Sequence, residues 1–119
     1  MRVAITIGCL LLPLLAATWA GQAAARALSA TELKRLHGVY QAVWKGKKAR
    51  VRVRRDGTLL ARSGTRVDVG RWRVRGNELC VSFRVWTHGR YKCGRLERQG
   101  AWMIGLRRKD GRPRLKLRR

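Results

Sequence analysis

Arginine recurs at every second position in two segments of this chain. In residues 50–54 arginines alternate with valines, and in residues 71–75 they alternate with a tryptophan and a valine. A guanidinium group donates paired hydrogen bonds to a phosphate or a carboxylate, so rows of this kind suit the binding of anions. The residues predicted to bind anions are these two rows and the basic C-terminal segment: Arg50, Arg52, Arg54, Arg71, Arg73, Arg75, Arg107, Arg108, Lys109, Arg112, Arg114, Lys116, Arg118 and Arg119.

The net charge favours an anionic partner. The 119 residues include 29 Lys and Arg against 6 Asp and Glu, a formal charge of +23. A charge of this size exceeds what solubility needs and destabilises the compact state through self-repulsion. The partners expected are anionic envelope components, namely lipopolysaccharide, anionic lipid or a cell-wall polymer. Two alternatives stay open: nucleic acid, with Trp44, Trp86 and Tyr91 stacking on bases if they are exposed, and a solvated basic surface without a specific ligand.

The acidic residues do not form a pair placed for acid–base catalysis. The spacing explains Glu32 by helix capping, Asp56 and Asp110 by turns, and Glu78 by its place at the start of a strand. The two histidines have no cysteine or carboxylate at metal-ligand spacing. We therefore predict a non-enzymatic protein without catalytic residues, metal or cofactor.

Asp68 stands apart from the other acids because it lies among arginines. An ion pair with Arg66 or Arg71 is the favoured interpretation. Apolar residues fall on odd positions over 67–69 and on even positions over 72–74, which predicts a β-bulge at Gly70 and Arg71.

Residues 1–20 have the pattern of an export signal. A positive Arg2 precedes an apolar run, and small residues follow, with cleavage predicted after Ala20. The chain is therefore expected to be periplasmic or secreted. An uncleaved anchor is an alternative, and so is lipidation of Cys9, although fewer apolar residues precede Cys9 than follow it.

Removal of the signal leaves two cysteines, Cys80 and Cys93. An even pair in an exported chain most simply forms a disulfide. The alternative is two free, buried thiols. A bridge that closes a loop of this length contributes roughly 3 kcal/mol in the chain-entropy model.

The remaining residues predict one small β-domain over 29–119, preceded by a flexible lead-in over 21–28. The S-x-x-E spacing from Ser29 to Glu32 predicts a capped helix over 30–37. Two-residue periodicity then predicts eight strands, bounded by glycine turns, at 39–45, 49–54, 58–62, 67–75, 79–86, 90–98, 101–107 and 114–118. The expected fold is an all-β, antiparallel, eight-stranded meander that forms a small barrel or a sandwich, with a short N-terminal helix.

Alternation also predicts which side chains form the core. The set is Val51, Val53, Leu59, Trp72, Leu79, Val81, Phe83, Val85, Trp102, Ile104, Leu106, Leu115 and Leu117. The arginines between them would then form the outer surface.

The segment Asp68-Val69-Gly70-Arg71-Trp72, the Leu79-Cys80 pair and Cys93 together resemble a pattern in small exported proteins, mostly from alphaproteobacteria. That resemblance covers about residues 29–119 and implies a periplasmic β-domain with one disulfide, without catalytic residues. The order of Trp72, the cysteines and Trp102 is more weakly similar to the lipocalin-like inhibitors of secreted metalloproteases. This second resemblance implies a protease as an alternative partner.

Overall fold

The structure is a computed structural model, and it describes residues 25–119. The predicted export signal, its cleavage site and Cys9 lie outside these residues. The described chain is all-β, with one antiparallel sheet and the short helix α1 (Ala30–Lys34). No helix within it has the length and hydropathy needed to cross a membrane.

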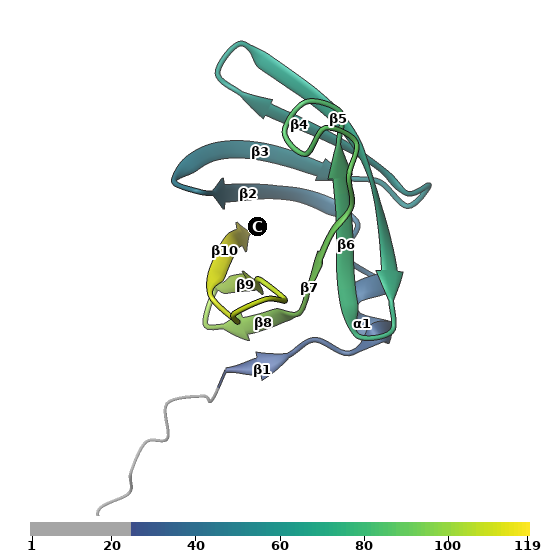
Figure 1. Cartoon of the computed structure of the whole chain (residues 1–119), viewed down its shortest axis with the longest axis vertical. Coiled ribbons are helices and arrows are strands. Elements are labelled where there is room, and N and C mark those ends of the chain that lie inside the picture. Colours follow the sequence, from purple (N-terminus) through teal and green to yellow (C-terminus); the bar gives the residue numbers. More distant parts are fainter. Residues whose placement is uncertain (1–24) are drawn as a thin grey trace, which may run out of the picture.

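The sheet has ten strands and curls into a barrel-like shape (Figure 1). The strands are β1 (Arg26–Ala27), β2 (Gly38–Trp44), β3 (Lys47–Val53), β4 (Thr58–Ser63), β5 (Arg66–Arg75), β6 (Glu78–Phe83), β7 (Lys92–Gly94), β8 (Leu96–Gln99), β9 (Trp102–Leu106) and β10 (Pro113–Arg118). Their order is β1-β8-β9-β10-β2-β3-β4-β5-β6-β7. Consecutive strands are therefore neighbours from β2 to β7 and from β8 to β10, as expected for a meander.

The prediction of eight strands is wrong in number, because the predicted strand 90–98 is two strands and β1 is additional. β7 pairs with β6 at one end of the sheet, and β8 pairs with β9 near the other end. The chain passes between them through Arg95 alone, whose carbonyl accepts a hydrogen bond from the Leu106 N–H at 2.9 Å. A Cβ at Gly94 would clash with the Leu106 carbonyl, so glycine permits this close crossing.

The helix begins at the predicted cap. Ser29 Oγ accepts from the Glu32 N–H at 3.2 Å, and the Ser29 N–H donates to Glu32 Oε1 at 3.3 Å. Arg26 of β1 also donates to the Glu32 carboxylate, and these hydrogen bonds lower the pKa of Glu32 to about 2. The helix ends at Lys34 instead of residue 37, yet Leu36 still packs in the core.

Strand β5 has no bulge at Gly70, which corrects the prediction. Its register against β4 and β6 is continuous, and the even-numbered residues from Asp68 to Val74 point inward. Val67 and Val69 are 50% and 51% exposed on the outer face, whereas Asp68 is 4% exposed on the inner face. The prediction failed because it assumed that the apolar residues on both sides of Gly70 share one face, whereas Val67 and Val69 lie outside and Trp72 and Val74 inside.

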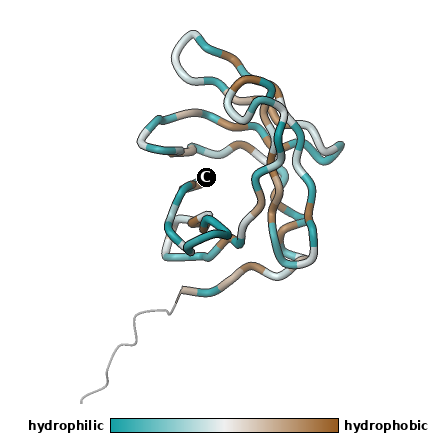
Figure 2. The backbone as a smooth tube through the Cα atoms, viewed as in Figure 1, coloured by the Kyte–Doolittle hydropathy of each residue, from teal (hydrophilic) through white to brown (hydrophobic). Residues whose placement is uncertain are grey.

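The core follows the same alternation elsewhere, with two corrections. In β9 the central cluster contains Met103, which lies opposite Leu117 on the inner face, whereas Trp102 and Leu106 are only partly buried; Ile104 is buried as predicted, outside that cluster. Val85 lies in the loop after β6 and is 61% exposed. Figure 2 shows the resulting alternation of hydrophobic and hydrophilic stretches along the strands.

The predicted disulfide between Cys80 and Cys93 is confirmed. The two residues lie opposite one another on β6 and β7, with their Cα atoms 4.0 Å apart. Because β7 has only three residues, the bridge is a major restraint on its position beside β6.

Replacing both cysteines (Cys80→Ala with Cys93→Ala) should lower the free energy of unfolding by about 3 kcal/mol, since the loop is then open in the unfolded chain. Urea unfolding of the double variant and of the wild type, each with and without dithiothreitol, measures this. Dithiothreitol should affect the wild type alone. Equal stability of the oxidised and reduced wild type would contradict the prediction.

Candidate anion-binding site

The strands β10, β2, β3 and β4 place basic side chains on one continuous outer surface. In β3 the buried Val51 alternates with exposed Arg50 and Arg52. The register sets Arg118 opposite Gln41, Gln41 opposite Arg50, and Arg50 opposite Arg62, which makes one row across four strands. We call this surface the outer basic face; its cations are Lys48, Arg50, Arg52, Arg62, Lys116 and Arg118.

The outer basic face lacks a carboxylate partner within the described residues. The ion pairs of the described residues involve four arginines, namely Arg26, Arg107, Arg108 and Arg112. None of these belongs to the outer basic face. Arg118 instead stacks 5.6 Å from the centre of the Trp102 ring.

The predicted row on β5 lies on a different part of the surface. Arg73 is 4.0 Å from the centre of the Tyr91 ring, and Arg75 lies opposite Glu78 on β6. Arg71 is exposed, and so is Arg54 beyond the end of β3. The predicted anion-binding residues are therefore divided among several surfaces.

The basic residues predicted to bind anions in the C-terminal segment also lie in different places. Arg107 and Arg112 pair with Asp110 in the loop between β9 and β10. Arg108 reaches Glu78 at the start of β6, with distances of 2.6 and 3.0 Å. The hydrogen bond from Arg107 lowers the pKa of Asp110 to about 2, and that from Arg108 lowers the pKa of Glu78.

Arg119 lies away from both of these surfaces. Its guanidinium donates to the His37 carbonyl at 3.3 Å and to the Tyr40 hydroxyl at 3.2 Å. It also lies 5.4 Å from the centre of the Tyr40 ring. Arg119 therefore anchors the C-terminus beside the start of β2.

An open cavity of about 530 Å³ lies between β7 and the start of β10. Its walls are apolar, and basic residues surround it. The apolar lining includes Trp44, Leu79, Val81, Leu96, Leu106 and Leu115. The basic residues that line it are Lys45, Lys92, Arg107, Arg108, Lys109 and Arg114. We call it the seam cavity.

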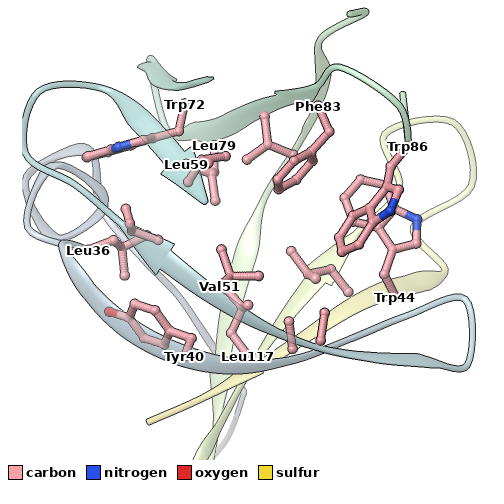
Figure 3. Close-up of a pocket in the computed structure, with 15 residues that line it drawn as sticks. Leu36, Tyr40, Trp44, Val51, Leu59, Trp72, Leu79, Phe83, Trp86 and Leu117 are labelled. Atoms are coloured by element: carbon pink, nitrogen blue, oxygen red, sulfur yellow. The ribbon is translucent and has the colours of Figure 1, made fainter. Parts of the chain in front are cut away.

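The seam cavity shares four lining residues with a smaller, apolar cavity of about 40 Å³ in the interior: Trp44, Leu79, Val81 and Leu115. Figure 3 shows the labelled side chains of that interior cavity converging from several strands and, through Leu36, from the segment between α1 and β2. The two spaces therefore adjoin.

The sequence-based prediction missed four basic residues, two on the outer basic face and two at the seam cavity. Lys48 and Arg62 continue the alternation of β3 and β4, and that alternation was the available signal. Lys45 lies in the β2–β3 turn and Lys92 beside Cys93, and only the curling of the sheet brings them to one opening. No local sequence pattern predicts that Lys45 and Lys92 line the same cavity.

The aromatic residues considered for base stacking do not form an exposed platform. Trp44 and Trp86 are half-buried and line the interior cavity, where both pack near Phe83. Tyr91 is 37% exposed and is already stacked against Arg73. None of the three lies on the outer basic face.

Asp68 is buried and has a local structural role, so the predicted ion pair with Arg66 or Arg71 is wrong. Its carboxylate accepts hydrogen bonds from the Val85 N–H at 3.1 and 3.2 Å and from the Trp86 N–H at 2.9 Å. These bonds hold the first turn of the loop that follows β6. Burial on the inner face directs the carboxylate away from the exposed arginines.

The described residues contain no cluster of three or more His, Cys, Asp or Glu side chains that could hold a metal ion. Comparisons of the chain with protein-family models, curated proteins and solved structures gave no match. The two family resemblances therefore stay predictions.

Replacing Asp68 with alanine should lower the free energy of unfolding by about 1–3 kcal/mol, because two backbone N–H groups lose their acceptor. Asp68→Asn keeps one acceptor oxygen and should lose less. Urea unfolding followed by tryptophan fluorescence measures both variants. An alanine variant as stable as the wild type would contradict this role.

Proposed function

We propose that this chain is a non-enzymatic, exported envelope protein whose outer basic face binds anionic glycolipid or polymer. The supporting observation is the row Arg118, Gln41, Arg50, Arg62 across four neighbouring strands, on a face whose cations form no ion pair with residues 25–119. Neighbouring strands lie about 4.8 Å apart, so Arg50 and Arg62 lie one strand spacing apart, and Arg118 lies two strand spacings from Arg50 with the neutral Gln41 between them. Such spacing suits a ligand with repeated phosphates or carboxylates.

The register adds a physical reason for an external anion. Arg50 lies directly opposite Arg62, and like charges in this position destabilise a sheet. An anion placed between the two guanidinium groups would replace that repulsion with charge-assisted hydrogen bonds. The ligand would therefore stabilise the fold as well as occupy the surface.

The compartment is consistent with this proposal. The Cys80–Cys93 disulfide fits an oxidising environment outside the cytoplasm. Export by residues 1–20 is part of the proposal. Lipopolysaccharide phosphates, anionic lipids and cell-wall carboxylates are the anions within reach there.

Replacing the opposed pair (Arg50→Gln with Arg62→Gln) should weaken binding to lipopolysaccharide roughly tenfold at low salt, through loss of two charge-assisted contacts. The matched control, Lys34→Gln with Arg90→Gln, removes the same charge from exposed positions elsewhere. Co-sedimentation at low and moderate salt measures the affinities. Wild-type binding should fall as salt rises, because salt screens the attraction.

Equal losses in the two double variants would contradict the proposal, because net charge alone would then explain binding. Binding that does not respond to salt would also contradict it. Single-stranded DNA and a secreted metalloprotease are tested alongside. Tighter binding to either than to lipopolysaccharide would contradict the assignment to the envelope.

A further inference from the structure

We propose that the seam cavity binds a single-chain anionic amphiphile, with the hydrocarbon tail inside and a carboxylate or phosphate headgroup at the basic opening. This site is separate from the outer basic face, and the inference goes beyond the proposed function. It depends on three properties of the cavity: its apolar walls, its excess of cations and its fixed shape.

The walls suit a hydrocarbon tail. Residues of β6, β8, β9, β10 and the end of β2 form them, including Leu79, Leu96 and Leu115. A volume of about 530 Å³ lies within the range of small-molecule sites. Water in such a space makes few hydrogen bonds, so its replacement by an apolar chain is favourable.

The direction of the tail follows from the neighbouring interior cavity. The shared residues Trp44, Leu79, Val81 and Leu115 form the boundary between the two spaces. A tail that enters between β7 and β10 would therefore point toward the interior, where Val51 and Phe83 also lie (Figure 3). The headgroup would stay at the opening.

The opening favours a negative headgroup. Lys45, Lys92, Lys109 and Arg114 line it and form no ion pair with the described residues. The nearby carboxylates are already engaged, Asp110 by Arg107 and Arg112, and Glu78 by Arg108. An anionic headgroup would therefore meet cations that lack a partner.

The cavity is held open by covalent and steric restraints. The disulfide keeps β7 beside β6, and the paired residues of β7 are matched to β6 alone. At one end of the cavity, the contact between Gly94 and Leu106 brings β7 and β9 together. The hydrogen bond from Arg108 to Glu78 connects the β9–β10 loop to β6. These restraints preorganise the site, which reduces the cost of binding.

Titration with dodecanoate and dodecyl phosphate, below their micelle concentrations, tests the proposal. Isothermal calorimetry and tryptophan fluorescence report on binding, the latter because Trp44 lines the cavity. We expect one equivalent of either anion to bind at least tenfold more tightly than dodecyltrimethylammonium. Affinity should rise about two- to fourfold per methylene from hexanoate to dodecanoate, and inorganic phosphate alone should bind weakly.

Two double variants separate this site from the outer basic face. Lys45→Gln with Lys92→Gln should weaken dodecanoate binding roughly tenfold, through loss of two unpaired cations at the opening. The same variant should keep its affinity for lipopolysaccharide. Arg50→Gln with Arg62→Gln should show the reverse pattern, and Lys34→Gln with Arg90→Gln should leave dodecanoate binding unchanged.

The inference would be overturned by equal affinity for dodecanoate and dodecyltrimethylammonium, or by an affinity that does not change with tail length. Wild-type dodecanoate binding by the Lys45, Lys92 variant would also overturn it. Each of these results leaves lipopolysaccharide binding by the outer basic face unaffected. Failure of one proposal is therefore distinguishable from failure of the other.

Discussion

The shortage of carboxylates determines how this protein presents its charge. Six Asp and Glu residues accompany 29 Lys and Arg, and most of the six are already engaged in local contacts. Asp68 holds a loop, while Glu78 and Asp110 pair with arginines next to the seam cavity. The outer basic face therefore keeps its positive charge, and the mutual repulsion of its cations opposes folding unless an anion or salt reduces it.

Alternation along the strands places the basic side chains outside and the core residues inside. In β5 the inward residues also contact the segments on either side. Asp68, Gly70 and Trp72 of β5 each make a close contact with a neighbouring segment. Asp68 accepts from the loop after β6, and Trp72 Nε1 donates to the Arg54 carbonyl at 2.7 Å. A Cβ at Gly70 would clash with the Ser82 carbonyl, so glycine lets β6 approach β5 closely. The contacts of residues 68–72 within the fold thus explain the sequence of this segment.

Much of the fold could be predicted because its signals are local. Two-residue periodicity and glycine turns identify most strands, the spacing of Ser29 and Glu32 identifies the helix start, and the paired cysteines identify the disulfide. The failures involve distant partners. The burial of Asp68 depends on N–H groups of a loop beyond β6, and the seam cavity forms only when the chain crosses at Arg95 from one end of the sheet to the other.

Thermal unfolding at increasing ionic strength tests most directly whether unpaired cations dominate the surface. If they do, raising salt from low to moderate concentration at pH 7 should raise Tm by several degrees, because screening reduces repulsion in the folded state. Micromolar polyphosphate should raise Tm further by binding the folded state. A Tm that stays constant or falls as salt rises would show that ion pairs, not unpaired cations, govern the surface, and would contradict the account.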